Sequence, residues 1–407
     1  MYIIGIDIAK KNHQAVITDS EGKVLGKTFR FSNSVEGFEI FISKVREVDC
    51  DFSKFEIGME ATGHYWLNLY SHLKKLDFKI HVINPLQSDA LRNLYLRRTK
   101  TDSVDSKIIA QVIRIGQFSE TELTDENTVV LRELSRQRFY LVDMRADFKR
   151  KVVVCMDKIF PEYQNFFCDM FGKTSSAILK TACSSDEING MSKENLGKIM
   201  KKASRGKFNI GKAAELKKLA SNSFSLCEDK KYISFIVKQM ILQIELLENQ
   251  IADLEEKIGE YFTSLNSKVT QIPGIGKVLG AAIVSEIGDI KRFSNSKKLT
   301  AFAGIDASVK QSGEFLSHEN HMSKRGSSFL RRALWIAAFV NVNHNSEIME
   351  LYRRKMNSGK CHFKTMGYVC HKILNIVYTV LKNNSDYVPF MWKNDASRGI
   401  SCCLTTC

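Results

Sequence analysis

The sequence predicts an α/β domain with a mixed sheet, then a long coiled coil, then a mainly helical domain. Three observations support this fold class. Apolar runs separated by turn residues open the chain, and strand-like runs then alternate with helix-like segments as far as Pro85. A heptad pattern spans residues 233–261. Helix-like segments predominate beyond it.

The first domain opens with an expected meander of three strands. Lys10-Lys11-Asn12 and Ser20-Glu21-Gly22 supply the turns between its apolar runs. Strands and helices then alternate, which indicates a mixed sheet flanked by helices. The expected strands cover 2–8, 13–19, 24–31, 54–60 and 78–83, and the expected helices cover 35–48, 63–76 and 103–116. Thr101 or Asp102 is expected to cap the last of these helices.

Four acidic residues lie at the ends of two expected strands and near the start of an expected helix. Asp7 ends the run YIIGID, Glu60 ends FEIGME, and Asp102 and Asp105 lie three apart in TKTDSVDSKIIAQV. The first two end adjacent strands, and the last two share a helix face, so all four can converge. An RNase H-like fold holds two divalent metals in this way. Each acid alone has an ordinary structural explanation, such as complementing a helix dipole, but the ordered set predicts Mg²⁺ (or Mn²⁺) and phosphodiester chemistry.

The charge balance predicts a polyanionic partner. Lys and Arg total 60 against 45 Asp and Glu, giving a net charge of +15. Nucleic acid is the simplest such partner, although a basic, well-solvated surface would give the same total. Arg97, Arg98 and Lys100 precede Asp102 and are expected to guide a phosphate backbone. The alternative is a solvated run of charges.

Several classes of location are disfavoured. We find no apolar run long enough to span a bilayer and no signal peptide at the N-terminus, so no membrane partner is expected. Ten cysteines are scattered without CxxC pairs, which indicates reduced thiols in a cytoplasmic protein.

The middle of the chain is expected to be helical throughout. Residues 126–160 form a basic helical stretch, and 161–228 are expected to form small helices with a basic surface. A heptad seam follows within 229–264, and it comprises Ile233, Val237, Met240, Ile244, Leu247, Ile251, Leu254, Ile258 and Tyr261. We favour a coiled coil between chains, giving a homodimer or a higher oligomer such as a tetramer. The alternative is a long helix packed within its own chain, for instance against 130–158.

The last domain opens with a glycine turn. Pro273-Gly274-Ile275-Gly276 precedes an expected helix at 277–287, and backbone amides at such a start can hold a phosphate. The pattern is typical of a helix-hairpin-helix, with Gly274 and Gly276 as candidate DNA contacts. An ordinary turn between packed helices is the alternative. Further helices are expected at 326–343 and 364–382.

A serine in this domain is a candidate nucleophile. Ser312 precedes Gly313 in a polar loop near Lys310, and basic residues follow it, namely Lys324, Arg325, Arg331 and Arg332. A serine beside glycine and cations can attack a phosphate, with the cations binding the nucleic acid. Ser-Gly is more often a simple turn, and no histidine–acid relay is apparent as an activator.

The chain resembles the DEDD transposases of bacterial insertion sequences, the RNA-guided "bridge RNA" recombinases. The matching segments are GIDIAK, GMEATGHYW, VINP, TKTDSVDSKIIAQ, IPGIGKVLGAAIVSEIGD, LTAFAGIDASVKQSG and SKRGSSFLRRAL. They cover roughly 1–160 and 265–340 and carry Asp7, Glu60, Asp102, Asp105 and Ser312.

The resemblance implies that the chain consists of domains with different functions. It implies a RuvC-like catalytic domain (1–160), a coiled coil (229–264) and a C-terminal transposase domain (265–390). The segment 161–228 matches no motif of the family and is expected to be a helical linker or insertion, and a tail is expected at 391–407. The four acids would bind magnesium, and Ser312 would attack DNA and become covalently linked to it. Ser308 is a nearby competitor for that role. The two parts of the active site would come from different protomers, and a structured guide RNA would choose the DNA sites by base pairing in the bacterial cytoplasm.

Three other functions compete with the recombinase. A RuvC-like nuclease would use water as nucleophile, with Ser312 structural. A sugar-kinase-like ATPase would explain GIDIAK but needs a second glycine-rich phosphate motif after a later strand. A non-catalytic nucleic-acid-binding dimer would tolerate Asp102→Asn. The ordered acids favour the recombinase.

Overall fold

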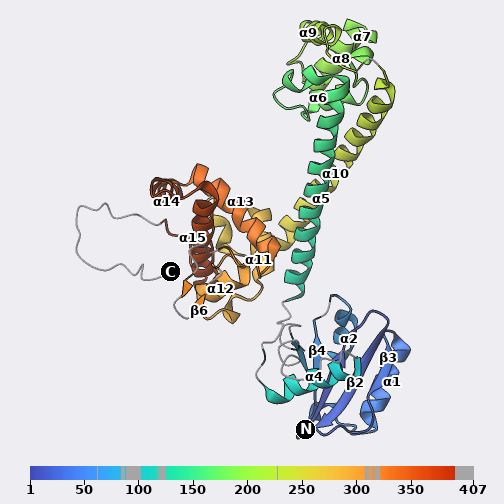
Figure 1. Ribbon diagram of the computed structural model, residues 1–407, viewed down its shortest axis with the longest axis vertical. Coiled ribbons are helices and arrows are strands. Elements are labelled where there is room, and N and C mark those ends of the chain that lie inside the picture. The colour runs from blue at the N-terminus through green and yellow to red at the C-terminus, as the bar shows by residue number, and fades with distance from the viewer. Residues whose placement is uncertain are drawn as a thin grey trace, which may run out of the picture. The chain divides into compact units, whose positions relative to one another are not determined.

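The structure is a computed structural model that describes residues 1–61, 63–83, 88, 102–116, 118, 125–226, 228–307, 311–312, 315–316 and 321–389. The chain divides into two compact units, an amino-terminal unit (Met1–Leu123) and a carboxyl-terminal unit (Thr124–Cys407), which are described separately (Figure 1). The helix at 126–159 belongs to the second unit. The domain boundaries expected at 160, 228, 264 and 390 stay predictions.

A five-stranded mixed sheet forms the middle of the amino-terminal unit. Its strands are β1 (Tyr2–Asp7), β2 (Asn12–Asp19), β3 (Phe29–Ser32), β4 (Phe55–Glu60) and β5 (Lys79–Ile83), in the order β3-β2-β1-β4-β5. β1 pairs antiparallel with β2 and parallel with β4, so the predicted meander and mixed sheet are confirmed. The third strand begins five residues later than the predicted start at 24, because Gly26 takes a positive φ of 80° that interrupts extended backbone.

Helices cover both faces of this sheet. α1 (Val35–Arg46) and α2 (Trp66–Leu73) pack against one face, where alternate β1 residues such as Ile4 and Ile6 point. α4 (Asp102–Ile115) lies across the other face and packs on Ile3 of β1. The result is a three-layer α/β/α unit, which agrees with the predicted fold class.

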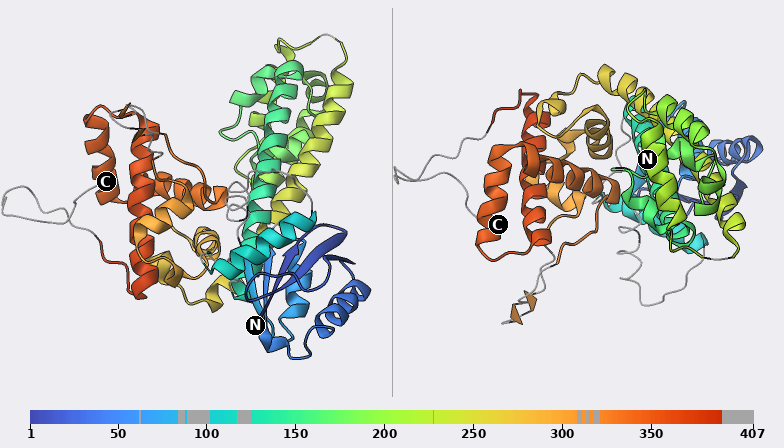
Figure 2. Two further views of the ribbon diagram at one scale, coloured as in Figure 1. Left: turned by 60° about the horizontal axis from the view of Figure 1, so that its bottom comes forward. Right: turned by 90° about the horizontal axis from the view of Figure 1, so that it is seen from above.

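Two long helices dominate the carboxyl-terminal unit. α5 (Glu126–Ile159) and α10 (Lys230–Ser264) lie side by side and run antiparallel (Figures 1 and 2). The heptad seam of α10 faces α5, where Leu247 and Ile251 pack with Leu141. Arg138–Glu255 at 2.6 Å and Lys149–Glu248 at 3.2 Å flank the seam.

Within one chain α5 therefore covers the seam, as the alternative interpretation expected, and a coiled coil between chains stays a prediction. The physical reason is tethering. Only residues 160–229 separate the two helices in sequence, so α5 reaches the α10 seam at a high effective concentration.

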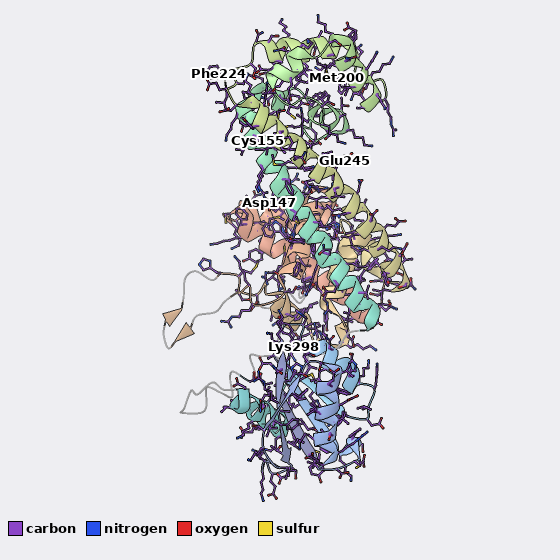
Figure 3. The ribbon with its side chains drawn as sticks, turned by 90° about the vertical axis from the view of Figure 1, so that its right-hand side faces the viewer. Asp147, Cys155, Met200, Phe224, Glu245 and Lys298 are labelled. Atoms are coloured by element: carbon purple, nitrogen blue, oxygen red, sulfur yellow. The ribbon has the colours of Figure 1, made fainter. Side chains whose placement is uncertain are left out.

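Residues 161–228 form a helical cap over the far ends of α5 and α10. It contains η2 (Pro161–Asn165), α6 (Lys173–Leu179), α7 (Ser185–Gly190), α8 (Lys193–Ala203) and α9 (Ile210–Ser221), so the expected small helices are confirmed. Its core joins Met200 of α8 to Met156 of α5 and Val237 of α10. Figure 3 labels Met200 in the cap, Asp147 and Cys155 on α5, and Glu245 on α10.

The rest of this unit is a helical bundle with one small hairpin. It comprises η3 (Lys268–Gln271), α11 (Lys277–Ile287), η4 (Ile290–Arg292), α12 (Ser296–Ala303), β6 (Gln311–Ser312), β7 (Phe315–Leu316), α13 (Ser328–His344), α14 (Ser346–Asn357) and α15 (His362–Asn383). The three helices expected here are present, whereas α12 and α14 were not predicted. Among the described residues, no helix combines the length and apolar character needed to cross a bilayer.

Candidate active site and nucleic-acid interface

Asp7 and Glu60 end neighbouring parallel strands at the same edge of the sheet. In the β1–β4 register Ile6 pairs with Met59, so Asp7 and Glu60 are the next residues on each strand. Both side chains are half-buried. Because the carboxyl ends of parallel strands open toward a crevice, this edge is a natural site for a ligand.

Two glycines allow α4 to lie directly on the sheet. A Cβ on Gly5 would lie 2.1 Å from the carbonyl oxygen of Ser106, and a Cβ on Gly58 would lie 2.4 Å from Ile113 Cγ1. Neither distance permits a side chain. Asp105 immediately precedes Ser106 and is only 6% exposed. The turn of α4 that carries Asp105 therefore contacts β1 two residues before Asp7.

The fourth acid and one unpredicted serine complete the description of this edge. Asp102 is the first residue of α4, but its side chain lies outside the described residues, as does Thr101. Ser88 is 1% exposed, and its Oγ donates a 2.7 Å hydrogen bond to Glu60 Oε2. This bond holds one orientation of the Glu60 carboxylate. Nothing in the sequence distinguished Ser88 from the other serines near it.

The donor set suits a hard divalent cation. Carboxylates are the ligands that Mg²⁺ prefers, and Asp7, Glu60 and Asp105 come from three different elements. Within the ranges that the structure describes, however, no three acidic, histidine or cysteine side chains are grouped closely enough to form a ready metal site. The chemistry of these residues fits magnesium, while the coordination geometry stays a prediction.

Ser312 lies in the β6–β7 hairpin of the carboxyl-terminal unit. Ser312 pairs with Phe315, and an Ala307–Met322 bridge closes the base of the hairpin. Ser323 N donates to Asp306 O at 2.9 Å next to that bridge. The side chain of Ser312 lies outside the described residues, as do Ser308, Lys310, Arg97, Arg98 and Lys100 in full. Their predicted roles stay predictions.

Four cations after the hairpin differ in their surroundings. Lys324 and Arg325 are exposed. Arg331 Nη1 donates to the carbonyls of Ala303 and Gly326 at 3.1 and 2.8 Å. Arg332 forms two 2.6 Å hydrogen bonds with Asp143 of α5 and stacks on Phe139, 4.6 Å from its ring centroid. Arg331 and Arg332 thus have structural partners within this unit, and their DNA contacts stay predictions.

A buried carboxylate links the segment after the hairpin to α5. Glu286 of α11 is 5% exposed and accepts from Arg136 Nε at 2.6 Å and from Ser327 Oγ at 2.7 Å. Ser327 also caps α13, because its Oγ accepts from Leu330 N at 3.1 Å. No sequence motif indicates this network, because its members are separated by 41 to 150 positions.

The glycine turn before α11 is present as predicted. Gly274 has φ +75°, and Asn341 Nδ2 of α13 donates to Pro273 O at 2.5 Å. Gly276 is the N-cap of α11 and provides no side chain to cap it. The Gly274 side of the turn is thus packed against α13, whereas a Cβ on Gly276 would meet nothing within 4 Å.

Comparison with known proteins finds matches at both ends of the chain. A DEDD model of the IS110 type, described as "Transposase", matches residues 4–161, and a model described as "Transposase IS116/IS110/IS902 family" matches residues 266–353. An uncharacterized 44.8 kDa protein of insertion element IS116 from Streptomyces clavuligerus is 20% identical over 391 residues, covering 95% of this chain and 96% of that protein. The pilin gene-inverting protein of Moraxella bovis is 22% identical over 388 residues, covering 94% and 97% respectively.

Proposed function

Since this chain belongs to the IS110 family of transposases, we propose that it cuts and rejoins DNA strands with the carboxylates of Asp7, Glu60, Asp102 and Asp105 and the hydroxyl of Ser312. One observation carries the proposal. Asp7 and Glu60 end adjacent parallel strands, and the close approach of α4 at Gly5 brings the turn with Asp105 to β1. Two-metal phosphodiester chemistry needs acids from separate elements to converge, and the proximity of these elements supports that convergence.

Transposases of the DEDD type are typically metal-dependent, and we take Mg²⁺ (or Mn²⁺) as the ion that these acids hold. A bound Mg²⁺ would supply positive charge to the phosphate oxygens. Residues of this chain hold the carboxylates that would bind the ion. Ser88 fixes the Glu60 carboxylate by its 2.7 Å hydrogen bond, and burial of Asp105 keeps competing water away from that carboxylate.

Ser312 is the proposed nucleophile. Its oxygen would bond to phosphorus while the bond from phosphorus to one deoxyribose oxygen breaks. The serine gives up its proton, and the released deoxyribose hydroxyl gains one. The phosphoserine ester keeps the energy of the broken bond, so another deoxyribose hydroxyl can reverse the step and join a new strand.

The net charge and the family membership support particular binding partners for this chain. A net charge of +15 supports binding of DNA and of a structured guide RNA in the bacterial cytoplasm. The printed name of the Moraxella bovis relative associates that protein with gene inversion. We extend to this chain the rejoining of DNA that an inversion requires. A homodimer or tetramer would have to use a surface other than the α10 seam, because α5 covers that seam.

A recombination assay in cells tests the proposal. The gene with its native flanking DNA is expressed as wild type, Asp105→Asn, Ser312→Ala and the control Asp253→Asn, an exposed acid on α10. Excision and insertion junctions are sequenced. We expect junctions from the wild type and the control only. Junctions from Asp105→Asn would refute the carboxylate assignment, and junctions from Ser312→Ala would transfer the nucleophilic role to water or to Ser308.

A further inference from the structure

The cap at the far ends of α5 and α10 carries a concentrated positive charge (Figure 1). From Lys193 to Lys218 the chain has nine basic residues and two acidic ones. This segment therefore has a net charge of +7, close to half of the +15 of the whole chain. It covers α8, α9 and the turn between them, and it contains none of the residues proposed above to contact DNA.

Two of these cations have structural roles within the cap. Lys217 Nζ donates to the carbonyl of Asn189 at 2.7 Å, in the last turn of α7. Lys212 pairs with Glu215 at 2.7 Å on α9. A surface that is open to a ligand must therefore be sought among the other cations of the segment.

Four cations occupy the outward side of α8 and the turn that follows it. Lys198, Lys201 and Lys202 recur at positions i, i+3 and i+4, which lie on one face of a helix. Arg205 follows in the turn, and all four residues are exposed. The opposite face of α8 carries Met200 into the core of the cap (Figure 3). We call these four residues the α8 cations.

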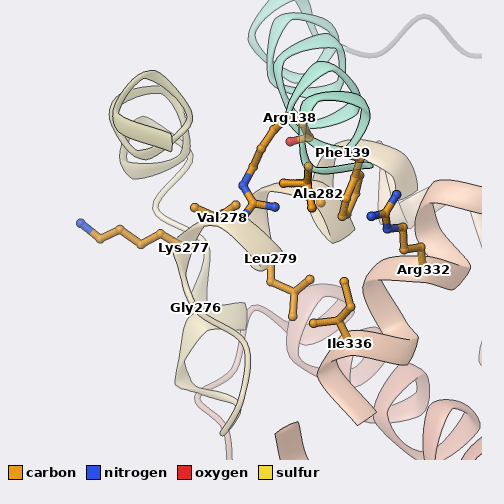
Figure 4. Close-up of a pocket in the computed structure, with 11 residues that line it drawn as sticks. Arg138, Phe139, Gly276, Lys277, Val278, Leu279, Ala282, Arg332 and Ile336 are labelled. Carbon is orange, nitrogen blue, oxygen red and sulfur yellow. The ribbon is translucent and has the colours of Figure 1, made fainter. Parts of the chain in front are cut away.

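Within the described part of the chain the α8 cations pair with no acid, in contrast to arginines elsewhere in the same unit. Figure 4 shows Arg138 and Arg332 at a pocket between α5, α11 and α13, where Arg138 pairs with Glu255 and Arg332 with Asp143. Like charges three or four residues apart on a helix repel one another. A bound polyanion would remove that repulsion.

The backbone at Arg205 provides a second, independent observation. α8 ends in a Schellman motif, since Gly206 N donates to Lys201 O at 2.8 Å and Arg205 takes φ +53°. Glycine is the usual residue at this left-handed position, because a Cβ is unfavourable there. The Arg205 side chain caps no carbonyl of the described residues. An arginine kept where glycine would stabilise the fold indicates a role outside folding.

The composition and length of α8 narrow the class of polyanion. α8 has no aromatic residue on which unpaired bases could stack, so its surface suits the backbone of a duplex better than a single strand. The seven positions from Lys198 to Arg205 span roughly 10 Å of helix, which matches about three phosphates along one strand. Transposases act on DNA, so DNA is the duplex that family membership favours.

We propose that the α8 cations bind the phosphate backbone of duplex DNA, without regard to sequence, at a distance from the strands that are cut. Leu131 of α5 belongs to the core of the bundle and Met156 to the core of the cap, so roughly 38 Å of helix separates the two. That length corresponds to about 11 base pairs of duplex. The inference rests on the proposed function, because DNA is taken as the ligand.

Two triple variants isolate the charge of α8. Lys198→Gln/Lys201→Gln/Lys202→Gln removes three charges at exposed positions, and the corresponding triple arginine variant keeps them. Both leave the buried face of α8 unchanged, so both should melt like the wild type.

Two further variants separate local charge from net charge and from folding. The control triple Lys27→Gln/Lys74→Gln/Lys75→Gln removes three exposed charges from the amino-terminal unit. Arg205→Gly removes the fourth of the α8 cations, and its melting temperature should rise, because glycine relieves the strain at φ +53°.

The experiment measures fluorescence anisotropy of a labelled DNA duplex of about 40 base pairs on the full chain, in EDTA and over a range of salt. We expect the α8 glutamine triple to raise the Kd roughly tenfold and to reduce the salt slope by about three, since each lost phosphate contact reduces it by about one. The α8 arginine triple and the control triple should keep the wild-type slope. Arg205→Gly should reduce the slope by about one despite its higher melting temperature.

Three results would overturn the inference. The first is an unchanged Kd and slope for the α8 glutamine triple. The second is an equal loss in the control triple, because net charge alone would then account for binding. The third is a loss of affinity for an RNA duplex of the same length with none for the DNA duplex, which would show that the surface takes RNA.

This outcome is separate from that of the strand-transfer proposal. None of the proposed catalytic residues lies in the cap, and EDTA removes the metal that cleavage requires. Unchanged binding by the α8 glutamine triple therefore leaves strand transfer intact. Conversely, junctions from Asp105→Asn would refute the carboxylate assignment without altering the binding result.

Discussion

Gly5→Ala tests whether the contact between α4 and β1 assembles the acidic site. The new Cβ would lie 2.1 Å from Ser106 O and 2.6 Å from Ala110 N. Both atoms are backbone, so a side-chain rotation cannot relieve the clash. Ordinary van der Waals contact begins at 3.4 Å, and α4 must therefore move away from β1 by roughly 1 Å.

This displacement has two measurable consequences. Overpacking of this kind costs about 1–3 kcal/mol of unfolding free energy. Asp105 sits in the displaced turn, so its carboxylate moves relative to Asp7 and Glu60. A misplacement of about 1 Å can reduce a rate by roughly 100-fold. We expect a lower melting temperature and a recombination rate reduced by roughly two orders of magnitude.

Thermal unfolding by circular dichroism and quantitative junction sequencing measure the two effects. Gly259→Ala is the matched control, because Gly259 lies within α10 and its Cβ would meet nothing within 4 Å. Alanine there should stabilise the helix by up to about 1 kcal/mol and leave recombination unchanged. A Gly5→Ala protein that melts and recombines like the wild type would refute the argument that this glycine positions Asp105.

Three other predictions concern the rest of the chain. Leu247 is 5% exposed in the α5–α10 seam, so Leu247→Ala should lower the free energy of unfolding by about 2–4 kcal/mol. This decrease should not depend on protein concentration. A decrease that does depend on concentration would favour the coiled coil between chains. Burial raises the pKa of Cys183 and of Cys370 to about 12, so both stay thiols at pH 8. Both should therefore be alkylated far more slowly than the exposed Cys50. Equal alkylation of all three, measured by mass spectrometry, would contradict the packing. Burial lowers the pKa of His13 below 6.5, so the unfolded chain binds the proton more readily than the folded chain. The free energy of unfolding should therefore fall as the pH drops below 6.5. His13→Gln should make the unfolding free energy, measured by urea titration, depend less on pH in this range.

The positions of Asp7, Glu60 and Asp105 on their strands and helix could be predicted because the signals are local. A strand that ends in an acid is visible in YIIGID and in FEIGME, and the parallel pairing of β1 with β4 then places Asp7 beside Glu60. The helical period likewise placed Asp105 on α4. What could not be predicted is the role of Ser88, because its contact with Glu60 crosses 28 positions of chain.

In the carboxyl-terminal unit, local sequence patterns do not identify which residues the helices and arginines contact. A heptad seam specifies a helix with one apolar face, but any complementary apolar face can cover it. α5 does so here. Arginines near a candidate nucleophile suggest a phosphate contact, yet Arg332 stacks on Phe139 and pairs with Asp143, 189 positions away. A charge takes its nearest well-placed partner, and the sequence does not show which partner is near.

The sequence by itself determined the order of strands and helices in the amino-terminal unit, the acids at the strand ends, the glycine turn before α11 and the resemblance to transposases, because each depends on neighbouring residues. The tertiary structure alone decided that α10 pairs with α5, that Glu286 holds Arg136 and Ser327, and that Arg332 pairs with Asp143. Those contacts join residues far apart in the chain. Their partners are selected by packing and by the cost of leaving buried polar groups unsatisfied.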